Sequence, residues 1–231
     1  GEVAGDRPAS VTAARCRALI ALERFDEAGQ AAAQLEELAP ASEETYACMG
    51  HLLWFQGRRA EAVEWVTRAI DANPNRVENV RLYLDPEFPR PEKDPIRTLD
   101  RLMKKYPQSW ALESLAASLF MAKKDWDAGV VLAIDAAAHG AADELLVELT
   151  GRMGHRGLHK EVARLAERAG GWSKFLESDA LLRSNLAASL QQVGQAEAAR
   201  SLWSSVYADG SVHPQIRRRA AEALEQCEIH C

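Results

Sequence analysis

The sequence predicts an all-α protein, a right-handed α-solenoid of about six helix-turn-helix repeats with a C-terminal capping helix. Turn-forming residues recur at intervals of 33 or 34 positions, at Pro40, Pro74, Pro107 and Gly140. Between them, apolar residues follow the three- and four-residue spacing of amphipathic helices, and no stretch of strand length alternates apolar and polar residues. Because a short two-helix unit cannot bury both of its faces alone, neighbouring units are expected to stack.

The period divides the chain into six units. Beyond Gly140 it reaches two further turn-like stretches, Trp172-Ser173 and Asp209-Gly210. We therefore expect an N-terminal tail over 1-8, units over about 9-41, 42-74, 75-107, 108-140, 141-173 and 174-213, and a capping helix over 214-231. A second, out-of-phase set of turns lies at 24–28, 57–62, 124–128, 155–157 and 193–198. Each unit is therefore expected to consist of two helices.

Residues 45–55 illustrate the helical pattern. Tyr46, Met49, Leu52 and Leu53 share one apolar stripe. Gly50 faces the next helix, where the absence of a side chain lets two backbones approach closely. Small residues also stand early in the second helices of three units, where a larger side chain would push the pair apart: Ala28, Ala62 and Ala128.

The residue types of the second unit follow a known pattern. The unit reads Tyr46-x2-Met49-Gly50-x2-Leu53, then Ala62-x3-Val66, then Pro74. It resembles the tetratricopeptide repeat family, whose pattern is aromatic, Leu-Gly, aromatic, Ala, aromatic and Pro. Looser matches occur in the first unit, at Phe25-Asp26-Glu27-Ala28 and Pro40, and in the last, at Leu186-Ala187 and Ala199-x3-Trp203. The resemblance covers nearly the whole chain by period and about half of it by residue type.

Two units depart from the pattern. In the third, the first helix after Asn75 must stop near Leu84, because the Pro-rich run from Asp85 to Pro91 cannot continue it. We expect this run to form an exposed loop and a point of low local stability. The fifth unit, from Ala141, keeps only the length and the turn.

Composition and charge narrow the classes of function. A hydrophobic content of 47% with 27% charged residues fits an ordered protein. The sequence has no run of 18 uncharged apolar residues, so we expect no membrane insertion. A net charge of −6 without a recognition motif argues against nucleic-acid binding. Four scattered cysteines are too few for a disulfide framework, which favours a reducing, cytoplasmic location.

The sequence argues against catalysis and metal binding. A hydrolase triad, a phosphate loop, a dinucleotide fingerprint and a metalloprotease helix are all absent in their usual spacing, so we expect no enzyme and no cofactor. Cys227, His230 and Cys231 lack the paired spacing of structural zinc sites and leave a fourth ligand position unfilled. His155 and His159 flank a turn and are not expected to hold a metal.

The resemblance implies a binding face. In tetratricopeptide repeat proteins the first helices line a concave groove that receives an extended peptide or a partner helix. The matching partner-binding positions here are Arg17, His51, Trp54, Phe55, Ser114, Ser118, Met121 and Gln191. Trp54, with His51, Phe55 and Met121 around it, is the candidate anchor, because large aromatic side chains dominate many interfaces. The alternative is that Trp54 and Phe55 pack into the neighbouring helix pair as ordinary core.

The resulting hypothesis is a protein-protein interaction scaffold that binds a partner peptide or helix in the concave groove. The alternative is a regulatory or interaction domain of a larger multidomain enzyme or sensor. A free-standing enzyme is a third class, which the missing catalytic motifs argue against.

Overall fold

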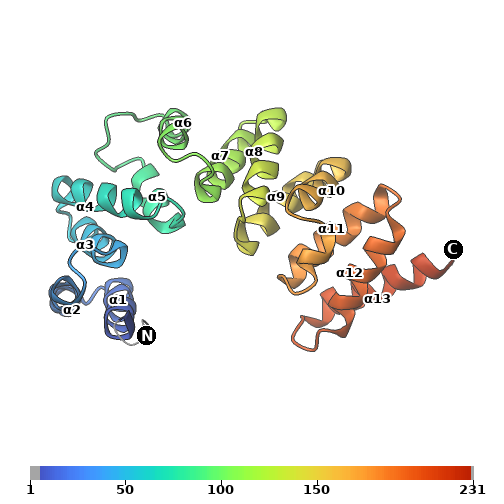
Figure 1. The fold of residues 1–231 in the computed structure, drawn as a ribbon, viewed down its shortest axis with the longest axis horizontal. Coiled ribbons are helices and arrows are strands. Elements are labelled where there is room, and N and C mark those ends of the chain that lie inside the picture. The colour runs from blue at the N-terminus through green and yellow to red at the C-terminus, as the bar shows by residue number, and fades with distance from the viewer. Residues whose placement is uncertain (1–5, 230–231) are drawn as a thin grey trace. The chain divides into compact units, whose positions relative to one another are not determined.

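The computed structural model describes the backbone of residues 6–229 and the side chains of residues 8–226. These residues form thirteen α-helices and one short 3-10 helix, without a β-strand (Figure 1). The predicted all-α class is therefore confirmed for the described part of the chain. The helices are α1 (Asp6–Ala21), α2 (Phe25–Leu38), α3 (Glu43–Phe55), α4 (Arg59–Ala72), α5 (Val77–Leu84), α6 (Pro95–Lys105), α7 (Trp110–Ala122), α8 (Trp126–Ala138), α9 (Asp143–His155), α10 (His159–Arg168), the 3-10 helix η1 (Trp172–Phe175), α11 (Ala180–Gln192), α12 (Ala196–Ala208) and α13 (Pro214–Ile229).

The predicted turns coincide with the ends of these helices. Pro40, Pro74, Pro107 and Gly140 each lie between two helices, and Gly140 has a φ of 87°, a left-handed conformation that favours glycine. Several helices begin at a polar cap: the Ser42 hydroxyl accepts a hydrogen bond from the Thr45 backbone N–H at 3.2 Å. Local turn and cap chemistry thus explains where the helices start and stop.

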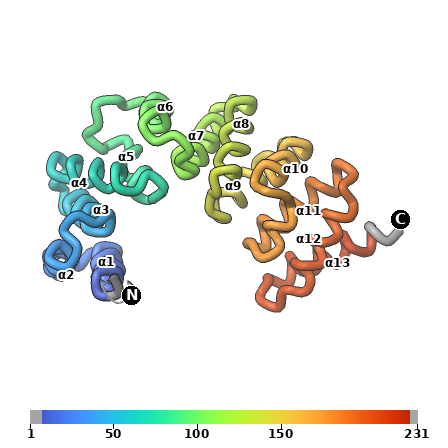
Figure 2. The backbone as a smooth tube through the Cα atoms, in the orientation of Figure 1, coloured from blue at the N-terminus to red at the C-terminus, as the bar shows by residue number. Residues whose placement is uncertain are grey.

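The chain folds as two compact units that meet in sequence between Tyr106 and Pro107. We call their described parts the N-terminal block (residues 6–106) and the C-terminal block (residues 107–229), and consider each by itself. In the N-terminal block, α1 packs on α2 and α3, and α3 packs on α4 (Figure 2). In the C-terminal block, α7 packs on α8, α10 lies between α8 and α11, and α11 packs on α12. Most consecutive helices therefore pair and stack in a repeat-like manner, whereas α5 packs on α4 and does not form a close pair with α6.

Gly50 occupies a close contact between α3 and α4, as predicted. A Cβ atom at this position would lie 2.7 Å from Val66 Cγ2 and 3.0 Å from the Val66 backbone nitrogen. In α8 of the C-terminal block, Gly129 makes the equivalent close approach, because a Cβ there would lie 2.7 Å from Met121 Cγ. Backbone-to-backbone proximity at these points leaves no room for even one methyl group.

Replacement of Gly50 by Ala is expected to destabilise the protein. Overpacking against the Val66 backbone outweighs the better helix propensity of Ala, so the free energy of unfolding should fall by about 1 to 2 kcal/mol. Gly29→Ala in α2 is the matched control, because a Cβ atom there would meet no neighbouring element within 4 Å. That control should gain about 0.5 to 1 kcal/mol. Urea unfolding of both variants checks the pair, and equal effects would contradict the close-contact interpretation.

The Pro-rich run in the third unit is only partly as predicted. Helix α5 does end at Leu84, but the loop that follows is not uniformly exposed, since Phe88 is fully buried and Arg90 is 4% exposed. The Arg90 guanidinium donates hydrogen bonds to the carbonyl oxygens of Tyr83 at 3.0 Å, Lys93 at 3.1 Å and Asp85. These bonds and the buried ring fix the loop against α5. The loop is therefore exposed in part, as expected, at Pro86, Glu87, Pro89 and Pro91. Its low local stability stays a prediction, against which the buried Phe88 ring and the bonds of Arg90 argue.

Candidate functional site

A pocket of about 260 Å³ opens in the N-terminal block on the faces of α1, α3 and α5. Three of the predicted partner-binding residues, Arg17, His51 and Phe55, come together in it. The full lining is Arg17, Ile20 and Ala21 from α1, Ala47, His51 and Phe55 from α3, and Arg76, Glu78 and Asn79 from the start of α5. Aliphatic and aromatic carbon forms one part of this lining, and ionisable and amide groups form another.

A network of hydrogen bonds fixes the polar wall of the pocket. Glu43, whose side chain is only 10% exposed, accepts two bonds from the Arg76 guanidinium, at 3.2 Å to Oε1 and 2.7 Å to Oε2. Asn79 donates from Nδ2 to Glu43 Oε1 at 3.0 Å, and its Oδ1 lies 3.2 Å from His51 Nε2. Paired, bidentate bonds of this kind set geometry as well as energy. The network thus holds the first turn of α5 against α3.

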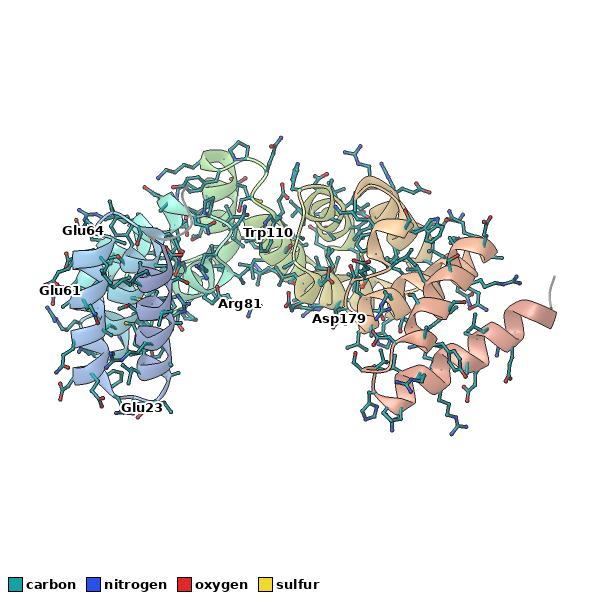
Figure 3. The ribbon with its side chains drawn as sticks, turned by 60° about the horizontal axis from the view of Figure 1, so that its bottom comes forward. Glu23, Glu61, Glu64, Arg81, Trp110 and Asp179 are labelled. Carbon is teal, nitrogen blue, oxygen red and sulfur yellow. The ribbon has the colours of Figure 1, made fainter. Side chains whose placement is uncertain are left out.

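Arg17, the cation that α1 contributes to the pocket, has a different environment from Arg76. Arg17 is exposed and forms no ion pair within the described part of the chain, whereas Arg76 is bound to Glu43. Glu78 is exposed and lines the pocket on α5, whereas the exposed acidic residues Glu23, Glu61 and Glu64, labelled in Figure 3, do not line it. Arg17 is therefore available to bind an acidic group of a ligand.

Burial lowers the pKa of His51 below its usual range, although the hydrogen bond with Asn79 opposes this change. As the pH falls through about 6.5, the unfolded chain takes up this proton before the folded chain does. The contribution of neutral His51 to stability is thus complete above that pH and declines as the pH falls toward the lower pKa of the folded state.

We expect a nuclear magnetic resonance titration of the His51 ring to give a pKa below about 6.5. Asn79→Ala should lower the pKa further, because it removes the hydrogen bond that favours the charged ring. A His51 pKa at or above the ordinary histidine value, or a rise in Asn79→Ala, would contradict the assigned cause.

Trp54 does not belong to this pocket. Its ring packs against Phe88 of the α5–α6 loop, with 5.4 Å between centroids, and the Arg59 guanidinium lies 5.0 Å from its ring centroid. The side chain is half-buried, whereas the neighbouring Phe55 is 56% exposed. Of the two adjacent aromatic residues, Phe55 faces the pocket and Trp54 supports the loop.

The remaining predicted residues lie in the C-terminal block and are engaged internally. Ser114 and Met121 are 1% and 3% exposed. Ser118 donates to Glu148 Oε1 at 3.0 Å, and Gln191 Oε1 accepts from the Trp203 indole N–H at 3.3 Å.

Sequence reasoning missed the contribution of α5 to the pocket. Arg76 and Asn79 stand 33 and 36 residues after Glu43, the residue that binds both. Other polar contacts between successive helix pairs have similar separations, such as Lys105 to Asp71 at 34 residues. A search for complementary polar residues one repeat period apart could therefore have found this wall.

A second pocket, of about 190 Å³, lies in the C-terminal block. It brings His155 and His159 onto one surface with Asn185, Ser189 and Arg219, and His159 Nδ1 lies 3.3 Å from Ser189 Oγ. No group of three His, Cys, Asp or Glu side chains with metal-binding geometry occurs among the described residues. Of the candidate zinc ligands, the Cys227 side chain and all of His230 and Cys231 lie outside the described part of the chain.

No described helix is both long and apolar enough to cross a membrane.

No protein-family model matches the chain, and no curated protein matches it significantly.

Proposed function

We propose that this chain is a protein-protein interaction scaffold of tetratricopeptide-like repeats, arranged as a right-handed α-solenoid, which binds an extended segment of a partner protein. The observation that carries the proposal is the pocket on α1, α3 and α5, the first helices of three successive pairs. Family resemblance in the second unit supports the same face, since first helices line the groove in that family.

The chemistry of the pocket suits a peptide with an apolar side chain near an acidic group. Ile20, Ala47 and Phe55 offer apolar surface, and burial of such surface drives association. Arg17 offers a cation that has no ion pair among the described residues. A charge of this kind contributes to specificity and association rate more than to affinity. The Glu43–Arg76 network fixes the wall in advance, which limits the entropy lost on binding.

A comparison of baits tests the proposal. Affinity purification from the native cell would use the unchanged protein, Phe55→Ala, and Val131→Ala as a matched control, because Val131 is 59% exposed on α8 of the other block. A partner bound through the pocket should be retained by the unchanged protein and the control, and weakened about 30-fold by Phe55→Ala. Calorimetry with the purified partner measures the change. Equal affinity for Phe55→Ala and the control, with Arg17→Glu also unchanged, would reject this binding face.

A further inference from the structure

Two buried thiols lie where α1 packs on α3. Cys16 is 0% and Cys48 is 1% exposed, and both belong to one buried cluster of the N-terminal block. Each thiol is also within donor distance of a backbone carbonyl: Cys48 Sγ lies 3.7 Å from the Ala13 oxygen, and Cys16 Sγ lies 3.6 Å from the Ala28 oxygen. Because Ala13 lies about one turn before Cys16 on α1, the Cys48 side chain of α3 reaches the part of α1 that carries Cys16.

We propose that Cys16 and Cys48 are a modification site, at which hydrogen peroxide converts the two thiols into a reversible disulfide linking α1 to α3. In the first step, the Cys16 sulfur attacks a peroxide oxygen, so an S–O bond forms, the O–O bond breaks and one water leaves after protonation. In the second step, the Cys48 sulfur attacks the sulfenic sulfur of Cys16, the S–S bond forms and a second water leaves. The thiols lose two electrons and two protons, and the peroxide is reduced to two waters.

The two sulfurs have different roles in this reaction. In its thiolate form, Cys16 accepts the Cys48 S–H, which otherwise points to the Ala13 carbonyl oxygen. This hydrogen bond and the Arg17 charge lower the pKa of Cys16, whereas the same bond and burial raise the pKa of Cys48. Because the thiolate is the nucleophile, Cys16 reacts first and Cys48 resolves the sulfenic acid.

The location of the pair next to the pocket determines what the bond changes. Arg17 and Ala47, the neighbours of Cys16 and Cys48 in sequence, line the 260 Å³ pocket, as do Ile20 and His51 one helical turn further on. Cys16 and Cys48 thus lie on the same two helices as this part of the pocket lining. Since α1 and α3 both supply that lining, a covalent link between them restrains the walls of the pocket relative to each other.

The test uses the full chain with Cys227 and Cys231 replaced by Ser, which leaves Cys16 and Cys48 as the remaining cysteines. After treatment of the folded protein with hydrogen peroxide, we expect the intact mass to decrease by two hydrogen atoms and peptide mapping to join Cys16 to Cys48. The oxidised chain should keep its helical circular dichroism, melt roughly 5 °C or more higher, and return to the starting state with dithiothreitol.

Three outcomes overturn the proposal: added oxygen without a cross-link, a cross-link between two chains, or a cross-link that forms only in denaturant. Cys48→Ser in the same background is the control, and a folded variant should instead accumulate a Cys16 sulfenic acid that dimedone traps. If Cys48→Ser does not fold, the mass change and the melting shift of the two-cysteine chain still decide the question.

Discussion

Phe88→Ala is expected to lower the free energy of unfolding of the N-terminal block by about 3 to 5 kcal/mol, because it opens a cavity around a fully buried ring. The Phe88 ring lies between two aromatic partners, 5.4 Å from the Trp54 centroid and 5.2 Å from the Tyr83 centroid. Its loss also releases the segment that Arg90 ties to α5 through three carbonyl oxygens. Urea unfolding followed by tryptophan fluorescence measures the change.

A neighbouring exposed residue provides the control. Glu87 pairs with Arg59 at 2.5 Å, but the two side chains are 64% and 49% exposed, so Glu87→Ala should cost less than about 1 kcal/mol. Limited proteolysis adds a local readout: the loop after Leu84 should resist cleavage in the unchanged protein and in Glu87→Ala, and become the first site cut in Phe88→Ala. Equal behaviour of the two variants would show that the ring does not anchor the loop.

The helix boundaries could be predicted because they depend on local chemistry. Proline or glycine residues lie between many of the helices, and the end of α5 at Leu84 follows directly from the Pro-rich run. The anchoring of that run could not be predicted, because Phe88 and Arg90 belong to no apolar period. Their burial depends on Trp54 and Tyr83, which other segments supply through tertiary contacts.

The site was predictable in part for a similar reason. The family resemblance placed Arg17, His51 and Phe55 on first helices, and all three line the pocket, while helical spacing explains only why His51 and Phe55 share one face of α3. Their role in binding a partner stays a prediction. Spacing alone could not separate Trp54 from Phe55, because adjacent residues lie about 100° apart on a helix and the pattern includes both. The deciding contact came from Phe88, more than 30 residues later in the chain.

Trp54→Ala is expected to cost about 2 to 3 kcal/mol of stability, somewhat less than a fully buried aromatic residue, because the ring is half-buried. The loss arises from its contacts with Phe88 and the Arg59 guanidinium. The double variant Trp54→Ala/Phe88→Ala should lose less stability than the sum of the two single losses. The shortfall, which is the coupling energy of the aromatic pair, should be about 0.5 to 1.5 kcal/mol. Urea unfolding of both single variants and the double variant gives this coupling energy.

A measurement of binding affinity distinguishes a support role of Trp54 from a role as interface anchor. If Trp54 acts through the loop, the folded fraction of Trp54→Ala should bind a pocket ligand with nearly unchanged affinity, whereas Phe55→Ala should weaken binding and lose little stability, since its ring is 56% exposed. Affinity must therefore be measured at a temperature and urea concentration where both variants are folded. A large loss of affinity in Trp54→Ala with an unchanged melting temperature would restore Trp54 as the anchor, because a residue that only supports the loop cannot reduce binding without first reducing stability.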